Sequence, residues 1–450
     1  MKVRHVLLTL AIAVVIMALA AACAPAPTPV PTAAPPTAAP AQPTAAPAPP
    51  TSAPQPTSAP AAPPTTAPTA APKVGTTYKI GFAPDTTGGG SFLGEPEDQV
   101  GKILSDRLNQ QGGVVGPDGV HHPVQILIKD TQSTPDTGVS VARGFIDQDK
   151  VVALVMGSST PVSLAIAPVA EESKIPYVSM ASSSAIITDP KTNKMLPWVF
   201  KTPQSNGDVA VWFADRVQKM GAKTAGYLYE NTGFGKDVFN NAKAALEKVG
   251  VKTVFSDSFE RSDTTFPQMA GLKAANPDVV IVGAIPPGAS LVTVAIRDTL
   301  PNVPILQGHG VCTPDFIKLA GKAAEGVELP CSAVIIAEDV PASDPQKAIF
   351  MDFKTTFEKA TGKPVSTFGG HAWDALYWVI DALKSLPDGL TLDQQRQQVR
   401  DYIETKIVNW PGTAGVFTVT PTDHYGLTPA SFTWFKIENG KFVPFPKAKW

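Results

Sequence analysis

Short apolar runs alternate with amphipathic helical stretches from Tyr78 onward, and this alternation leaves few architectures open to the chain. Apolar runs of four to eight residues between helices are typical of buried strands in parallel sheets, which helices cover on both faces. Two such series follow one another, which is too much for one sheet and predicts two α/β lobes. The expected strands are 78–84, 124–128, 151–156, 175–180, 224–229, 251–255, 279–284 and 303–307, and the expected helices include 161–173, 207–220, 234–249, 264–275, 288–298, 313–321, 344–361, 368–384 and 391–407, before a β-like tail at 415–445.

Proline is concentrated before these lobes. Of the 46 prolines in the chain, 18 lie between Ala24 and Pro72, in a stretch made otherwise almost entirely of Ala and Thr. Such a segment has no large side chains to bury, and its prolines remove backbone donors and favour extended conformations. We therefore interpret residues 23–76 as a disordered tether.

The amino terminus reads as an export signal. Lys2 and Arg4 precede an apolar run from Val6 to Ala22, which ends at Leu19-Ala-Ala-Ala-Cys23. This ending resembles a bacterial lipobox, although Ala20 stands where leucine is usual. The pattern predicts a signal peptide over 1–22, lipidation of Cys23 and an extracytoplasmic, membrane-anchored protein. The alternative is an uncleaved anchor helix.

Charge and motifs exclude several functions. The net charge is −2, and no long basic run exists that could neutralise phosphates, so we expect no binding to nucleic acid. The chain also lacks the Gly-x-Ser-x-Gly, His-Glu-x-x-His and P-loop patterns of common enzymes. We expect neither catalysis nor a metal nor a cofactor, and we expect a monomer.

Two loops rich in hydroxyl groups follow predicted strands of the first lobe. They are Met156-Gly-Ser-Ser-Thr-Pro161 and Ser179-Met-Ala-Ser-Ser-Ser184. In open α/β sheets, ligands bind outside the carboxyl ends of the strands, where loops present free backbone amides. The loops could hold a carboxylate there, or their hydroxyl groups could only cap the helices that follow.

Several stretches of the chain resemble, in order, the leucine/isoleucine/valine-binding protein family, which are type I solute-binding proteins of ABC importers. They are Leu108-Asn-Gln-Gln-Gly-Gly-Val-Val-Gly116, Ala142-Arg-Gly-Phe-Ile-Asp-Gln-Asp-Lys-Val151, Ala165-Ile-Ala-Pro-Val-Ala-Glu-Glu-Ser-Lys-Ile-Pro176, Tyr229-Glu-Asn-Thr-Gly-Phe-Gly235 and Leu319-Ala-Gly-Lys-Ala-Ala-Glu-Gly326. The resemblance implies two Rossmann-like lobes with parallel sheets, joined by three crossings near 201–203, 330–332 and 413–420. The implied first lobe comprises 77–202 and 332–415, and the second comprises 203–331 and 416–450.

The resemblance also implies a ligand site between the lobes. The carboxylate of an amino acid would be held by Ser158, Ser159, Thr160, Ala181 and Ser183. On the side of the ligand's ammonium group the match is weaker, because the family usually has an acid where this chain has His309. Phe234 replaces a common tyrosine, and Ile285 begins a stretch that is polar or aromatic in the family.

The resulting hypothesis is a binding component of an ABC importer that captures a branched-chain amino acid or a related small carboxylate and delivers it to permease subunits. An aromatic or aliphatic carboxylate, or an amide, is an alternative ligand, and a ligand-sensing receptor subunit is an alternative role. His371 could also face the cleft. Outside the cell, Cys312 and Cys331 can pair as a disulfide or remain two buried thiols.

Overall fold

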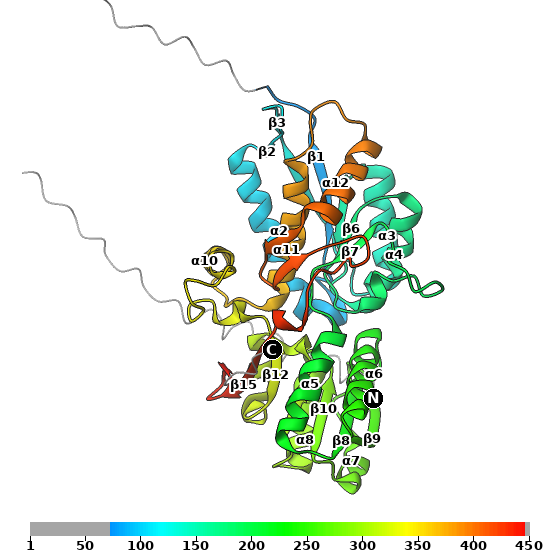
Figure 1. Ribbon diagram of the computed structural model, residues 1–450, viewed down its shortest axis with the longest axis vertical. Helices are drawn as coiled ribbons and strands as arrows, with labels where there is room; N and C mark the ends of the chain where they lie inside the picture. Colours follow the sequence, from blue (N-terminus) through cyan, green and yellow to red (C-terminus); the bar gives the residue numbers. More distant parts are fainter. Residues whose placement is uncertain (1–72, 446–450) are drawn as a thin grey trace, which may run out of the picture. The chain divides into compact units, whose positions relative to one another are not determined.

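The computed structural model describes residues 73–445, which lie within one compact unit (Figure 1). The predicted signal peptide, Cys23 and all of the predicted tether before Lys73 lie outside the described residues. Among residues 73–445, no helix combines the length and the apolar character that a membrane span needs.

A parallel five-stranded sheet forms the first lobe. Its order is β4 (Val124–Ile128), β1 (Tyr78–Ala83), β5 (Ala153–Met156), β6 (Tyr177–Ser179) and β7 (Val199–Lys201). Helix α2 (Ser91–Gln111) lies on one side of this sheet, and α3 (Pro135–Gly144) and α4 (Thr160–Ser173) lie on the other (Figure 1). Strands β2 (Val114–Val115) and β3 (His121–His122) form a small separate hairpin.

A seven-stranded sheet forms the second lobe. Its order is β9 (Lys252–Phe259), β8 (Thr224–Glu230), β10 (Val279–Gly283), β11 (Ile305–Gln307), β12 (Glu328–Cys331), β15 (Thr433–Glu438) and β16 (Lys441–Pro444). The strands up to β12 are parallel, and β15 and β16 continue the sheet in antiparallel pairing. Its helices are α5 (Asn206–Met220), α6 (Gly233–Lys248), α7 (Met269–Ala275), α8 (Gly288–Thr299) and α9 (Pro314–Ala320).

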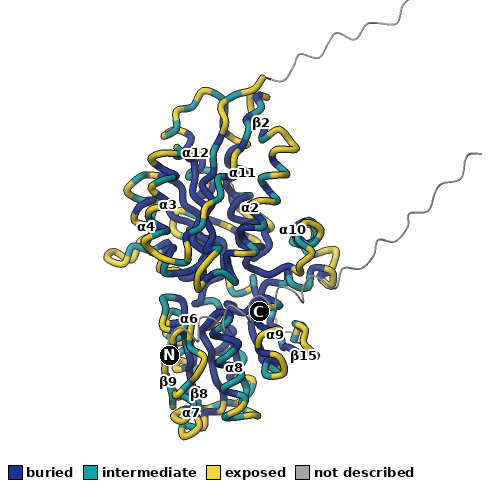
Figure 2. Tube along the Cα trace, turned by 180° about the vertical axis from the view of Figure 1, so that it is seen from behind, coloured by how far each residue is buried: buried dark blue, intermediate teal, exposed yellow. Residues whose placement is uncertain are grey.

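Strand β10 explains why the central strands are apolar throughout. Val280 and Val282 belong to the core beneath α8 and α9, whereas Val279 and Ile281 belong to the core beneath α5 and α6. Successive side chains of a strand point to opposite faces, so a strand covered on both faces must be apolar at every position. Figure 2 shows the buried residues along both sheets and the exposed residues on the outer helices. The predicted fold class is confirmed.

The chain returns from β12 to the first lobe. Helices α10 (Lys347–Thr361), α11 (Thr367–Leu383) and α12 (Leu392–Lys406) add to its core, where α11 packs on α2 and buries Trp373 and Trp378 completely. Strands β13 (Val408–Pro411) and β14 (Val416–Thr418) then form a hairpin.

The last crossing differs from the predicted one. Phe417, Val419, Tyr425 and Leu427 belong to the core of the first lobe, whereas the family resemblance implied that the second lobe resumes at residue 416. Phe417 packs edge-on against Trp378 of α11, and the chain reaches the second sheet only at Thr433, the first residue of β15.

A disulfide bond joins Cys312, in the turn after β11, to Cys331 at the end of β12, with 5.8 Å between the Cα atoms. The bond ties together the two strands that flank α9. Both cysteines are almost fully buried in the core of the second lobe.

Candidate ligand-binding site

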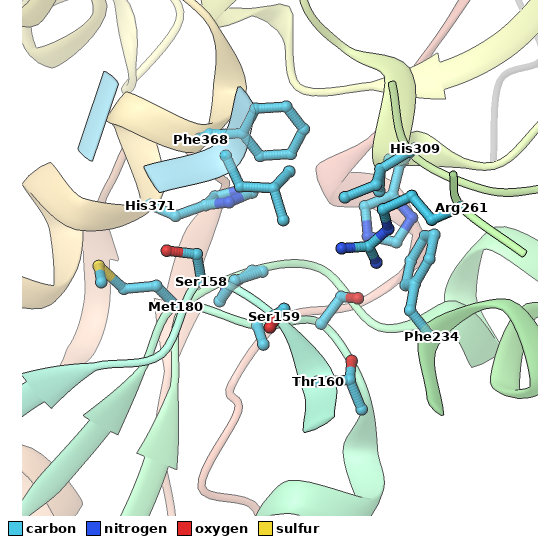
Figure 3. Close-up of a pocket in the computed structure, with 15 residues that line it drawn as sticks. Ser158, Ser159, Thr160, Met180, Phe234, Arg261, His309, Phe368 and His371 are labelled. Atoms are coloured by element: carbon cyan, nitrogen blue, oxygen red, sulfur yellow. The ribbon is translucent and has the colours of Figure 1, made fainter. Parts of the chain in front are cut away.

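A pocket lies where the carboxyl ends of the parallel strands of both sheets meet. Every part of its lining follows a strand of one sheet or the other, or belongs to α2, α11 or the first crossing between lobes. The lining residues are Leu93, Ser158, Ser159, Thr160, Met180, Ala181, Ser182, Pro203, Phe234, Arg261, Ile285, His309, Gly310, Phe368 and His371 (Figure 3).

The lining residues include most of the candidates predicted from the sequence. Ser158, Ser159 and Thr160 follow β5, Ala181 follows β6, and Phe234, Ile285 and His309 follow β8, β10 and β11; His371 comes from α11. The remaining candidate, Ser183, is not among the lining residues. Its hydroxyl instead accepts a hydrogen bond of 3.3 Å from the backbone N–H of Ala185 and caps a short helical turn, while the preceding Ser182 faces the pocket.

The loop after β5 depends on a glycine. Gly157 has φ = 72°, and a Cβ atom built on it would lie 2.5 Å from Oγ of Ser163. No side chain fits there, and the turn needs the left-handed conformation that glycine adopts without strain. The turn brings Ser158 to the pocket wall and starts α4 at Thr160.

Three helices begin at the pocket. Thr160 is the first residue of α4, Phe234 is the second residue of α6, and Phe368 is the second residue of α11. None of these helices has an acidic residue in its first turn. Helix N-termini carry partial positive charge and unpaired N–H groups, so their convergence favours an anionic group in the pocket.

The Ser158 hydroxyl is tied to two buried acids. Its Oγ atom accepts a hydrogen bond of 2.8 Å from the backbone N–H of Asp85, and it shares a short hydrogen bond with Oε2 of Glu97. Both acids are fully buried. Burial raises the pKa of the Asp85 carboxyl, against the opposing effect of hydroxyl and backbone donors, and it raises the pKa of Glu97 well above its usual value.

Arg261 is a site residue that the sequence reasoning missed. Its guanidinium group donates to both carboxylate oxygens of Glu230, at 2.7 and 3.1 Å, and to the backbone oxygen of Gly89 in the other lobe, at 3.0 Å. These bonds use three of the five N–H donors of an arginine. Figure 3 shows the guanidinium group directed toward the middle of the pocket. Arg261 follows β9, so the rule that selected the serine-rich loops also applied to this loop.

The two histidines of the pocket are uncharged. Burial, followed by the charge of Lys201, lowers the pKa of His309 to about 3, and burial also places the pKa of His371 well below its usual value. His371 Nε2 lies 3.3 Å from Oε1 of Gln204, while the amide nitrogen of Gln204 donates to Ala414. His371 therefore donates through Nε2, and its buried Nδ1 atom has no partner among the described residues, as is also true of His309 Nδ1.

The remaining walls are apolar, and the lining residues contain no carboxylate side chain. Leu93, Met180, Phe234, Ile285 and Phe368 supply this surface. Nor do residues 73–445 contain a cluster of three or more His, Cys, Asp or Glu side chains that could hold a metal ion. The site can therefore enclose a small apolar group and bind an anionic group attached to it.

Comparisons with known proteins agree with this architecture. A family model described as periplasmic binding protein matches residues 77–441. The chain is 25% identical over 369 residues to the Leu/Ile/Val-binding protein homolog 3 of Brucella melitensis, covering 81% of this chain and 92% of the relative. An extracellular ligand-binding receptor from Rhodopseudomonas palustris is 30% identical, with a TM-score of 0.73, and the match covers 82% of this chain and 99% of that one.

A solute-binding protein of an ABC transporter from Rhodopseudomonas palustris, solved with 3,4-dihydroxy benzoic acid, shares the fold at 20% identity and a TM-score of 0.68, over 82% of this chain and 96% of that one. The resemblance noted from the sequence is confirmed, and with it an extracytoplasmic solute-binding role. The chain belongs to the periplasmic binding protein family, whose members bind ligands and are not enzymes.

Proposed function

We propose that this protein captures a small carboxylate that carries an aromatic or aliphatic body and no ammonium group, and delivers it to an ABC importer. One observation carries the choice of ligand. Arg261 is the only charged side chain among the lining residues of the pocket, and no acid faces it there. An ammonium group enclosed in such a pocket would lack the charged partner that its desolvation requires.

The carboxylate would lie between Arg261 and the start of α4. Two N–H donors of the guanidinium group remain beyond the three that bind Glu230 and Gly89. On the opposite wall, Ser159 precedes α4 without capping it through its side chain, so the first amides of the helix are available to an anion. The ligand's body would pack against Phe234 and Phe368.

A branched-chain amino acid is the second candidate, because the Brucella relative is named as a Leu/Ile/Val-binding protein homolog. The unpartnered Nδ1 atoms of His309 and His371 are hydrogen-bond acceptors that an ammonium group could use. A neutral imidazole binds an ammonium group more weakly than a carboxylate does. This candidate therefore predicts that His309→Ala weakens leucine binding.

A ligand panel tests the proposal. Thermal unfolding of the full-length protein in detergent would be followed with benzoate, 3,4-dihydroxybenzoate, hexanoate, leucine and benzamide. At a ligand concentration of about 100 Kd, a bound compound stabilises the folded state by about 2.7 kcal/mol. We expect stabilisation by a carboxylate without an amine. Stabilisation by leucine alone would reject this ligand class, and benzamide tests whether the negative charge is required.

The anchor and the transport partner belong to the same proposal. Lipidation of Cys23 would hold the protein at the membrane, and the proline-rich tether would let the binding unit, acting as a monomer, reach permease subunits. We expect Cys23→Ala to release the protein into the soluble fraction. Retention in the membrane would instead favour an uncleaved anchor. Genes for a permease and an ATPase beside this one would separate the transport role from the role of a receptor subunit.

A further inference from the structure

Ser158 stands between the pocket and the buried acids Asp85 and Glu97, and its hydroxyl proton can point in only one of two directions. A hydroxyl group has one donor hydrogen and two acceptor lone pairs. The backbone N–H of Asp85 occupies one lone pair, at 2.8 Å. The bond to Glu97 Oε2 takes either the hydrogen or the second lone pair.

The state of Glu97 decides between these arrangements. An ionised Glu97 can only accept hydrogen bonds. It would accept one from the Ser158 O–H and leave a lone pair of Ser158 facing the pocket. A protonated Glu97 donates instead, fills the second lone pair of Ser158, and leaves the Ser158 O–H free to point into the pocket. The first arrangement repels a ligand carboxylate, and the second binds it.

The surroundings of the two acids favour a proton on Glu97. Asp85 Oδ1 accepts from Thr131 Oγ1 at 2.6 Å and from the Ser158 backbone N–H at 3.3 Å, and these donors stabilise a negative charge on Asp85. Glu97 has only the Ser158 bond. Each acid also has one buried oxygen without a partner among the described residues, Asp85 Oδ2 and Glu97 Oε1, so the acids differ in the number of donors to their other oxygen. Two adjacent buried carboxyl groups resist joint ionisation, and burial together with the charge of Asp85 raises the pKa of Glu97.

We propose that Glu97 is a positioning residue, which keeps its proton, donates it in a hydrogen bond to Ser158 Oγ and thereby directs the Ser158 O–H toward the ligand's carboxylate. The proposal rests on the proposed function, since it assigns the donor that would meet the anionic group. It makes Glu97, which does not line the pocket, a determinant of specificity for anions.

Infrared spectroscopy of the ligand-free, full-length protein tests the state of Glu97 without any ligand. The spectrum of Glu97→Gln is subtracted from that of the wild type near neutral pH, so that other buried acids cancel. We expect a C=O band of a protonated carboxylic acid in the wild type that is missing from Glu97→Gln. A difference spectrum with carboxylate bands and no carboxylic acid band overturns the proposal, even if the protein binds no carboxylate at all.

Binding of benzoate tests the consequence for the ligand. The glutamine of Glu97→Gln can donate an N–H to Ser158, so its Kd should stay within about threefold of the wild type. Methionine leaves the second lone pair of Ser158 unfilled but accepts no hydrogen bond from it, so Glu97→Met should raise the Kd by no more than about threefold. Ser158→Ala removes the donor itself and should raise the Kd about tenfold, the range of one hydrogen bond to a charged group. In a Ser158→Ala background the two variants should bind equally, because the effect acts through Ser158.

The outcomes separate the two proposals. Binding of benzoate about tenfold tighter in Glu97→Met than in the wild type would show that an ionised Glu97 accepts the Ser158 O–H, and it overturns the positioning role. A difference between Glu97→Gln and Glu97→Met that persists without Ser158 also overturns it. Failure of the wild type to bind benzoate or any other carboxylate rejects the proposed ligand class, and the infrared band then decides the state of Glu97 alone. The unfolding temperature of each variant shows whether it has folded, and Glu97→Gln with Ser158→Ala suffices if Glu97→Met does not fold.

Discussion

The ion pair between Arg261 and Glu230 allows the role of the pocket's charge in ligand binding to be tested separately from its role in the stability of the protein. The pair measures 2.7 Å, the Glu230 side chain is fully buried and the Arg261 side chain is 17% exposed. Arg261→Met would leave a buried carboxylate with only Thr232 Oγ1, at 2.8 Å, and the backbone N–H of Ile285, at 3.4 Å, as donors. Breaking one side of a buried pair costs about 3 kcal/mol of folding free energy.

A matched double variant removes that penalty. In Glu230→Gln/Arg261→Met the buried group is neutral. Its carbonyl oxygen can accept from the Ile285 N–H and its amide nitrogen can donate to Thr232 Oγ1, so the free energy of unfolding should return to within about 1 kcal/mol of the wild type. Urea unfolding of the wild type, both single variants and the double variant measures this recovery. A double variant as unstable as Arg261→Met would show that the arginine stabilises the protein by another route, such as its bond to Gly89 in the first lobe.

Ligand binding should not recover with stability. A charge-assisted hydrogen bond contributes about 1.5–3 kcal/mol, so the folded double variant should bind a carboxylate at least about tenfold more weakly than the wild type in isothermal titration calorimetry. Its affinity for an amide of the same shape should change less. A double variant that binds the carboxylate within about threefold of the wild type would refute the assignment of Arg261 as the anion's partner.

Three further predictions concern the disulfide, the first crossing and the closing of the cleft. Replacing Cys312 and Cys331 by serine should lower the free energy of unfolding by about 3 kcal/mol, because the bond closes a loop with a sequence separation of 19 residues; equal urea midpoints would contradict this. Burial lowers the pKa of Lys201 from 10.5 to about 7. Between these two pH values the folded state binds fewer protons than the unfolded chain, so the free energy of unfolding rises with pH in this range. Between about pH 7 and pH 9.5 the wild type should gain about 3 kcal/mol relative to Lys201→Met, and parallel pH profiles would refute this. A Cβ atom on Gly233 would lie 3.2 Å from Thr160 across the cleft. Gly233→Leu should therefore weaken ligand binding without lowering the unfolding temperature. An unchanged affinity would contradict a close approach of α4 and α6.

The alternation of apolar runs and helical periodicity predicted the parallel strands well, because strands buried on both faces must be apolar throughout. Strand β4 lies at the expected residues 124–128, and β10 differs from its expected range by one residue. The last crossing could not be placed in the same way. Phe417 and Trp434 are both large and aromatic, and only packing against Trp378 or Trp212 assigns each to its lobe.

The site was predictable to the extent that strand ends define it. The serine-rich loops after β5 and β6 were found by that rule, whereas His309 after β11 was implied by the family resemblance. Ser183, which the family resemblance implied, does not line the pocket, because neighbouring serines in a loop differ in backbone direction, which the sequence does not reveal. Arg261 was missed because a charged residue in a polar loop resembles an ordinary surface residue until its bonds to Glu230 and Gly89 are known.

A calorimetric comparison of benzoate with leucine on the full-length protein determines whether the pocket selects a ligand without an ammonium group. The pocket offers Arg261, three helix N-termini and two neutral histidines, without a carboxylate among its lining residues. We predict that benzoate, or another carboxylate without an amine, binds at least about tenfold more tightly than leucine. Tighter binding of leucine than of every such carboxylate would show that the pocket selects an amino acid instead.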